Sequence, residues 1–170
     1  FSSRGLEVIL QDIGEAILEE SLRHIESNLV FLGNHGLLGS GGVDAAIKRI
    51  KLTIHISEAM DGVDYVQESV PENYDIKKKV FKEMDAVAPH HSILASSASG
   101  LLMTEIQKVT KRPERCVLVH PMLPTHLIPA VEIVGGEQTS PETVSTTREF
   151  MEALGKTPVV LNREIPGYIV

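Results

Sequence analysis

The chain contains three kinds of polar residue that together could support proton transfer: a histidine, a glutamate and a group of serines. All three stand within or beside apolar segments. His120 directly follows the apolar run 116–119, and Glu132 stands 12 residues later inside a second apolar run, 130–134. The serine-rich stretch 96–100 precedes both. A neutral imidazole accepts a proton near pH 7, and a carboxylate beside it fixes its tautomer and stabilises its charged form. We therefore expect two neighbouring strands to finish with this imidazole–carboxylate pair at one edge of a sheet, near a serine hydroxyl.

Each of these residues also has a structural interpretation. A histidine after a strand and a glutamate within one are common in ordinary sheets, and a serine-rich turn usually bonds to its own backbone. A metal site formed by His120, His126 and Glu132 is a further alternative. Zinc ligands usually occur as close pairs, which two histidines six residues apart on a proline-rich loop match poorly, and the adjacent His90 and His91 are expected in an exposed turn. We therefore predict no metal site.

Length and composition indicate one globular domain with a substantial core. The chain has 170 residues, of which 42% are hydrophobic, and no segment is apolar for long enough to cross a bilayer. Its net charge of −7 and pI near 5.5 disfavour nucleic acid and anionic membranes as partners. The only basic run, residues 77–79, has acidic residues on both sides and is expected on a solvated helix face. The single cysteine, Cys116, is expected in the core and fits a reducing compartment such as the cytoplasm.

Strand patterns and helix patterns alternate along the whole chain. Apolar, β-branched segments predict strands at about 6–12, 51–54, 62–68, 92–96, 115–119, 128–134 and 157–161. Helical spacing predicts helices at about 15–32, 43–50, 74–87, 101–109 and 141–154. Ser140 is expected as the N-cap of the last helix, with Pro141 at its first position. This alternation predicts an α/β fold with a largely parallel sheet.

Two features of the first 42 residues bear on nucleotide binding. The glycine-rich stretch 33–42 follows a helix and lacks the lysine of a P-loop, so we interpret it as a connector. Asp12 ends the first predicted strand, where dinucleotide folds place an acid on the adenosine ribose. Its charge favours NAD over NADP. The glycine fingerprint that should accompany it would fall before Phe1.

Both ends of the chain suggest an internal piece of a longer protein. Residues 1–5 are typical of the last turn of a helix that ends on glycine, and the chain does not begin with methionine. Residues 166–170 contain no terminating signal. We therefore expect further sequence on both sides.

Several motifs, taken together, resemble the 3-hydroxyacyl-CoA dehydrogenase family. They occur in the family's order at residues 64–73, 95–101, 120–121, 127–132, 153–158 and 165–170. The likeness covers essentially the whole chain and is nearest to the branch with L-gulonate and carnitine 3-dehydrogenases, lambda-crystallin and short-chain hydroxybutyryl-CoA enzymes. It implies a Rossmann-like, doubly wound, mostly parallel sheet over residues 1–165 without the first strand. Residues 166–170 would begin a linker to a helical C-terminal domain that is absent.

The resemblance also implies catalytic roles. Ser99 matches the serine that hydrogen-bonds the substrate hydroxyl, His120 the catalytic base, and Glu132 the carboxylate paired with that base. The implied reaction is NAD-dependent oxidation of an L-3-hydroxyacyl-CoA, or a related 3-hydroxy acid, to the 3-oxo compound. The isolated fragment is expected to be inactive, and the full-length protein is expected to be a homodimer.

Further positions match cofactor contacts of the family. Asp12 corresponds to the ribose-binding acid, and Glu72 and Lys77 correspond to positions near the nicotinamide ribose. Ser97 stands where many acyl-CoA members have an asparagine beside the nicotinamide. The implied cofactor is NAD, and the implied partner is a small molecule.

Two departures from the family pattern keep a second interpretation open. Leu123 replaces the usual asparagine after the His-Pro-x motif, and the asparagine that follows the position of Val170 in the family would fall beyond the chain. A catalytically silent structural or NAD-binding relative, similar to a crystallin, is therefore the alternative to an active dehydrogenase.

Overall fold

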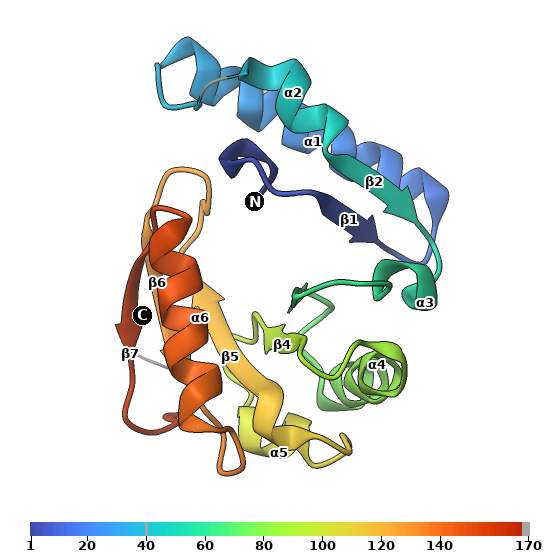
Figure 1. Ribbon diagram of the computed structural model, residues 1–170, viewed down its shortest axis with the longest axis vertical. Helices are drawn as coiled ribbons and strands as arrows, with labels where there is room; N and C mark the ends of the chain where they lie inside the picture. The colour runs from blue at the N-terminus through green and yellow to red at the C-terminus, as the bar shows by residue number, and fades with distance from the viewer. Residues whose placement is uncertain (40, 168–170) are drawn as a thin grey trace. The chain divides into compact units, whose positions relative to one another are not determined.

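Helices and strands alternate in the computed structural model as the apolar periodicity predicts (Figure 1). The structure describes residues 1–39 and 41–167. Most of the predicted linker, residues 168–170, lies outside the described part, as does residue 40 of the glycine-rich connector. The chain divides into two units, Phe1–Ala59 and Met60–Val170.

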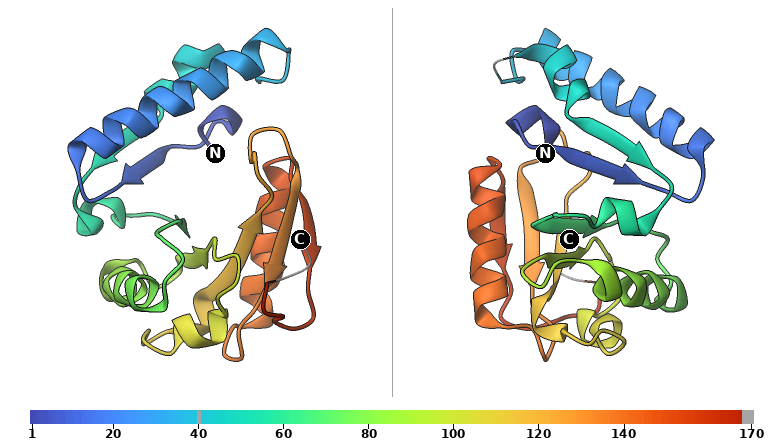
Figure 2. Two further views of the ribbon diagram at one scale, coloured as in Figure 1. Left: turned by 180° about the vertical axis from the view of Figure 1, so that it is seen from behind. Right: turned by 45° about the vertical axis from the view of Figure 1, so that its right-hand side comes forward.

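The first unit is built on a parallel pair of strands. Its elements are a 3-10 helix at Ser2–Arg4, β1 (Val8–Gln11), α1 (Glu15–Asn34), α2 (Gly42–Lys48), β2 (Ile50–Thr53) and α3 (Ile56–Ala59). Val8 is paired with Ile50 and Gln11 with Thr53. In Figure 2, α1 and α2 lie side by side along this pair. The helical turn predicted at the start ends at Gly5, whose φ of 89° is the left-handed conformation that glycine adopts readily.

The second unit is a five-stranded sheet with helices around it. Its elements are β3 (Tyr65–Glu68), α4 (Tyr74–Val87), β4 (Ile93–Ser96), α5 (Met103–Gln107), a 3-10 helix at Pro113–Arg115, β5 (Cys116–Pro121), β6 (Ala130–Val134), α6 (Pro141–Ala153) and β7 (Thr157–Val160). The strand order is β3-β4-β5-β6-β7. All neighbouring pairs are parallel except β5 and β6. The predicted α/β class with a mostly parallel sheet is therefore confirmed.

The antiparallel β5–β6 pair follows from the length of its connection. Only residues 122–129 separate the two strands. A parallel pair needs a crossover of a dozen or more residues, so this short loop must return the chain in the opposite direction. The sequence pattern did not predict α3 or the 3-10 helix at Pro113–Arg115, because four and three residues are too few to show a helical period.

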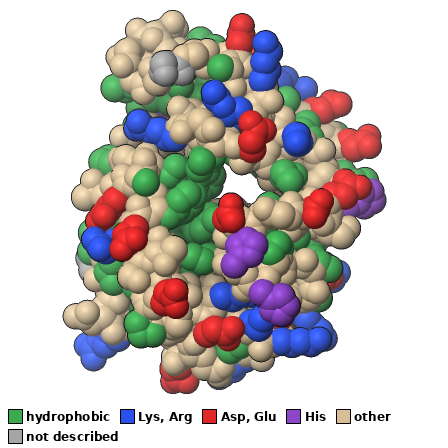
Figure 3. Space-filling view, viewed as in Figure 1, with side chains coloured by type: hydrophobic (Ala, Val, Ile, Leu, Met, Phe, Trp, Pro, Cys, Tyr) green, Lys and Arg blue, Asp and Glu red, His purple; other side chains and the backbone are tan. Residues whose placement is uncertain are grey.

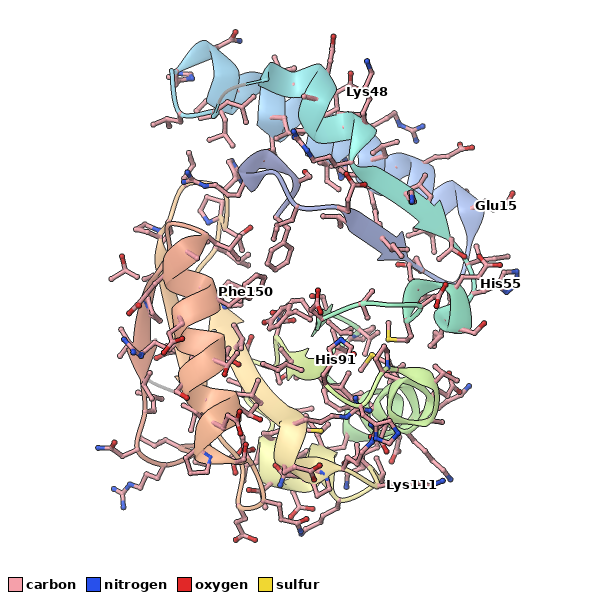
Figure 4. The ribbon with its side chains drawn as sticks, viewed as in Figure 1. Glu15, Lys48, His55, His91, Lys111 and Phe150 are labelled. Atoms are coloured by element: carbon pink, nitrogen blue, oxygen red, sulfur yellow. The ribbon has the colours of Figure 1, made fainter. Side chains whose placement is uncertain are left out.

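The core of the second unit lies between the sheet and α6. Alternate residues of β5 and β6 supply one buried face, which Met151 and Leu154 cover from α6 and its C-cap. That face consists of Val117, Val119, Val131 and Ile133, joined by Ala95 of β4. Figure 1 shows α6 lying along β5, β6 and β7. Figure 4 labels Phe150 of α6, whose ring centroid is 4.8 Å from that of Tyr65 in β3.

Side-chain caps fix the starts of the two longest helices of this unit. The Asn73 carboxamide oxygen accepts from the N–H groups of Asp75 and Ile76 at the start of α4. The Ser140 hydroxyl accepts from Thr143 N–H at the start of α6, with proline at the first helical position as predicted. Within residues 1–39 and 41–167, none of the helices combines the length and the apolar composition that a membrane span requires.

Candidate active site

His120 and Glu132 form a hydrogen-bonded pair across the β5–β6 ladder. They are direct partners in the antiparallel register, and Nδ1 of His120 lies 2.9 Å from Oε2 of Glu132. The side chains are 13% and 4% exposed. Because an ionised carboxylate only accepts, Nδ1 is the donor, and Nε2 is the ring nitrogen that can accept a proton from a substrate.

We expected both strands to end at the edge of the sheet where the pair lies, but only β5 ends there. His120 is the fifth of the six residues of β5, whereas Glu132 is the middle residue of β6. Since β6 is antiparallel, it begins at the edge of the sheet where β5 ends. The spacing brings the two side chains together, but through a cross-strand pair rather than two parallel strand ends.

The serine segment lies at this same edge. Ser96 is the last residue of β4 and pairs with Leu118 of β5, two residues before His120. The loop that contains Ser97 and Ser99 follows directly. Ser99 is exposed, and the Ser97 hydroxyl donates to that of Ser69 at 3.2 Å. The carboxyl ends of parallel strands, where α/β proteins bind their ligands, therefore carry these serines.

Glu72 binds the backbone of the serine loop, a contact that the sequence did not reveal. Its Oε1 accepts from three consecutive N–H groups, those of Ser99 at 2.9 Å, Gly100 at 2.7 Å and Leu101 at 3.2 Å. Glu72 itself stands in the short segment between β3 and α4. A side-chain contact with backbone 27 residues away leaves no periodic signal in the sequence.

A buried ion pair supports this part of the site. Lys77 is 1% exposed, and its ammonium donates to Glu68 Oε1 at 2.9 Å and to the Val70 carbonyl at 3.1 Å. The Ser96 hydroxyl donates to Glu68 Oε2 at 2.6 Å. The expectation that residues 77–79 form a solvated helix face is therefore wrong for Lys77. Its place four residues before the buried Phe81 was the available signal, because residues i and i+4 share a helix face.

Asp12 lies in the first unit, directly after β1 and before α1. Its Oδ1 accepts from Ile13 N–H at 2.6 Å, and the side chain is partly exposed. A carboxylate between a strand end and a helix start fits the paired hydroxyls of a ribose. Its negative charge does not fit a phosphate at the same position.

No group of three or more His, Cys, Asp or Glu side chains within residues 1–39 and 41–167 is arranged to hold a metal ion. His126 lies in the loop between β5 and β6, and His91, labelled in Figure 4, is exposed beside Asp64 at 3.2 Å. On the face drawn in Figure 3, the described Lys and Arg side chains lie among Asp and Glu side chains rather than forming one basic surface.

The mostly parallel sheet, its flanking helices and the polar groups at its carboxyl edge define a Rossmann-like α/β domain. The chain belongs to the 3-hydroxyacyl-CoA dehydrogenase family: residues 1–165 match the NAD binding domain of that family. The resemblance seen in the motifs is thereby confirmed, and NAD is the cofactor of the matched domain.

Relatives of this chain carry different activities in their names. L-carnitine dehydrogenase of Pseudomonas putida is 35% identical over 98% of this chain and 51% of its own length. Lambda-crystallin of Oryctolagus cuniculus is 34% identical over 100% of this chain and 54% of its own length. The solved structure of a 5-formyl-3-hydroxy-2-methylpyridine 4-carboxylic acid 5-dehydrogenase, an NAD+ dependent dismutase, has a TM-score of 0.88 and 34% identity, and covers 99% of this chain and 53% of that one. The chain thus spans about half the length of these proteins.

Proposed function

We propose that the full-length protein oxidises an L-3-hydroxyacyl-CoA or a related 3-hydroxy acid to the 3-oxo compound, with NAD as cofactor. The observation that supports this most directly is the His120–Glu132 hydrogen bond of 2.9 Å at the carboxyl edge of the sheet. It supplies an oriented base beside the loop that contains Ser99.

The chain's own residues would carry the proton chemistry. Ser99 holds the substrate hydroxyl by a hydrogen bond, and Nε2 of His120 takes the hydroxyl proton. Glu132 keeps the imidazole in its orientation through Nδ1 and stabilises the imidazolium that forms. NAD, when bound, supplies the acceptor for the hydride that leaves carbon 3. A positioned base of this kind contributes roughly 10²–10⁴ to the rate.

The cofactor contacts are part of the proposal. Asp12 would bind the adenosine ribose, for which its partly exposed carboxylate after β1 is suited. Glu72, Lys77 and Ser97 would lie near the nicotinamide ribose. Glu72 and Ser97 stand in the loops after β3 and β4, and Lys77 lies in the first turn of α4 with its ammonium 3.7 Å from Oε2 of Glu72. This place supports the proposal, because dinucleotides bind outside the carboxyl ends of such strands.

Two classes of substrate are compatible with the proposal, a CoA thioester and a free hydroxy compound, and they can be tested separately. The family name points to a CoA thioester, whereas the carnitine dehydrogenase relative points to a small free hydroxy compound. Leu123, 80% exposed in the loop after β5, presents an apolar side chain where the family pattern has an asparagine. NADH formation by the full-length protein with 3-hydroxybutyryl-CoA, L-gulonate and carnitine separates these cases. Turnover of at least one supports the proposal.

A silent relative is the second candidate, favoured by Leu123 and by the similarity to lambda-crystallin. It predicts that the full-length protein binds NAD but reduces none with any of the three substrates. We also propose a cytoplasmic homodimer, since the motifs resemble a family in which the second domain supplies the dimer contact. The mass of the full-length protein from light scattering tests the dimer.

A further inference from the structure

We infer that Glu72 is a positioning residue for Ser99: its carboxylate holds the backbone of the serine loop, and thereby the serine hydroxyl, in the geometry that the reaction needs. This inference rests on the proposed function, because it assigns Ser99 to the substrate. It goes beyond the cofactor contact implied for Glu72 by the motifs.

The geometry of Glu72 is that of an anion held by a turn. One oxygen, Oε1, accepts from the N–H groups of Ser99, Gly100 and Leu101 at 2.7–3.2 Å. Consecutive N–H groups that converge on one point form an anion-binding concavity, and hydrogen bonds to an ionised acceptor are stronger than neutral ones. The side chain therefore fixes three peptide groups at once.

Other support reaches the serine loop on both sides of Ser99 and Gly100. On one side Ala98 is buried, and its N–H donates to the Ser96 hydroxyl oxygen at 3.3 Å. Ser96 belongs to β4, and Leu102 N–H donates to the Tyr74 hydroxyl at 3.0 Å. Between them, Ser99 and Gly100 are exposed and belong to neither a helix nor a strand. Exposed irregular backbone opens easily, so the Glu72 bonds limit the motion of Ser99.

The Glu72 side chain is itself held in place by a neighbouring buried lysine. Its Oε2 lies 3.7 Å from the ammonium of Lys77, which is buried and bonded to Glu68 and to the Val70 carbonyl. The next residue, Asn73, caps α4. Glu72 therefore lies between a capped helix start and the buried Lys77–Glu68 ion pair, and these neighbours orient its carboxylate toward the serine loop.

The removal of this carboxylate should impair turnover through Ser99. In the full-length enzyme at saturating NAD, we expect Glu72→Ala to lower kcat/KM for the 3-hydroxy substrate about 10- to 100-fold, as for a lost hydrogen bond to a charged group. Glu72→Gln retains a carbonyl oxygen for the three N–H groups and should recover part of this loss. Glu83→Ala, which changes an exposed glutamate of α4, is the matched control and should leave kcat/KM unchanged.

A double-mutant cycle with Ser99→Ala tests the coupling. If Glu72 acts by placing the serine hydroxyl, Glu72→Ala costs little more in the Ser99→Ala background, because the hydroxyl is already gone. If the two losses multiply in full, Glu72 acts elsewhere, for example only on NAD, and the inference is overturned. Saturating NAD removes cofactor affinity from the comparison.

Hydrogen exchange measured by mass spectrometry tests the anchor without turnover. Glu72→Ala should speed exchange of the amides at residues 99–101, while peptides from β5 keep their wild-type rates. Unchanged exchange at 99–101 would overturn the inference. A wild-type protein that oxidises none of the substrates would contradict the proposed function and the kinetic role together, and the exchange result would still decide whether Glu72 holds the loop.

Discussion

His120 and Glu132 are directly opposite each other on antiparallel strands, and they lie on the sheet face that α6 does not cover. Their neighbours in the ladder, Val119 and Ile133, pack in the core with α6. Side chains alternate between faces along a strand, so His120 and Glu132 point the other way. A slip of one residue would turn the imidazole into the core, and the register of β5 and β6 is therefore a condition for the site.

The charge of Glu132 should matter more for turnover than for folding. Glu132→Gln keeps the size of the side chain and an oxygen that can accept from Nδ1 of His120, but it cannot stabilise an imidazolium by charge. We expect kcat of the full-length enzyme to fall roughly 10- to 100-fold, since a hydrogen bond to a charged group is worth about 1.5–3 kcal/mol. Unchanged kcat in a folded Glu132→Gln enzyme would contradict this role.

Removal of Lys77 should strongly destabilise the second unit. Lys77→Met leaves Glu68, whose side chain is 1% exposed, as a buried carboxylate without its cation. Loss of one partner of a buried pair costs about 3–5 kcal/mol. Denaturant unfolding monitored by circular dichroism should show this loss. Lys79→Met, at an exposed position on the same helix, is the control and should leave the free energy of unfolding nearly unchanged.

Acid should remove the stabilisation that Asp85 provides. Burial alone would raise the pKa of Asp85, but the Lys111 N–H and the guanidinium groups of Arg115 and Arg112 outweigh it and hold the pKa below its usual range. A carboxyl group whose pKa is lower in the folded state contributes stability above its unfolded pKa, about 3.9, and loses it as the pH falls through the folded value. The free energy of unfolding lost in Asp85→Asn should therefore be constant near pH 7 and shrink below about pH 4. Asp61→Asn, at an exposed position, should show no such difference; a loss in Asp85→Asn that stayed the same at low pH would contradict the assignment.

The thiol of Cys116 should be inert in the folded protein. Burial raises its pKa to about 12, so the reactive thiolate is scarce at pH 8. A thiol reagent such as 5,5′-dithiobis(2-nitrobenzoate) should react with the native protein far more slowly than with the protein in guanidinium chloride. Equal rates in the two conditions would show that this strand opens readily.

Much of the site could be predicted because its parts lie in regular elements with strong local signals. The apolar runs around His120 and Glu132 define two strands, and Ser140 before Pro141 marks a helix start that the structure confirms. Contacts between side chains and distant backbone leave no such signal, which is why the bonds from Glu72 to the serine loop were missed. Lys77 was misjudged because its two lysine neighbours suggested solvent, whereas the helical period places it with the core.

The most direct test of the central claim is the turnover number of full-length His120→Ala, measured as NADH formation with a 3-hydroxy substrate that the wild-type enzyme oxidises. The account predicts that kcat falls by roughly 10²–10⁴. His90→Ala, at an exposed turn, should retain wild-type kcat. A folded His120→Ala enzyme with full turnover would contradict the account.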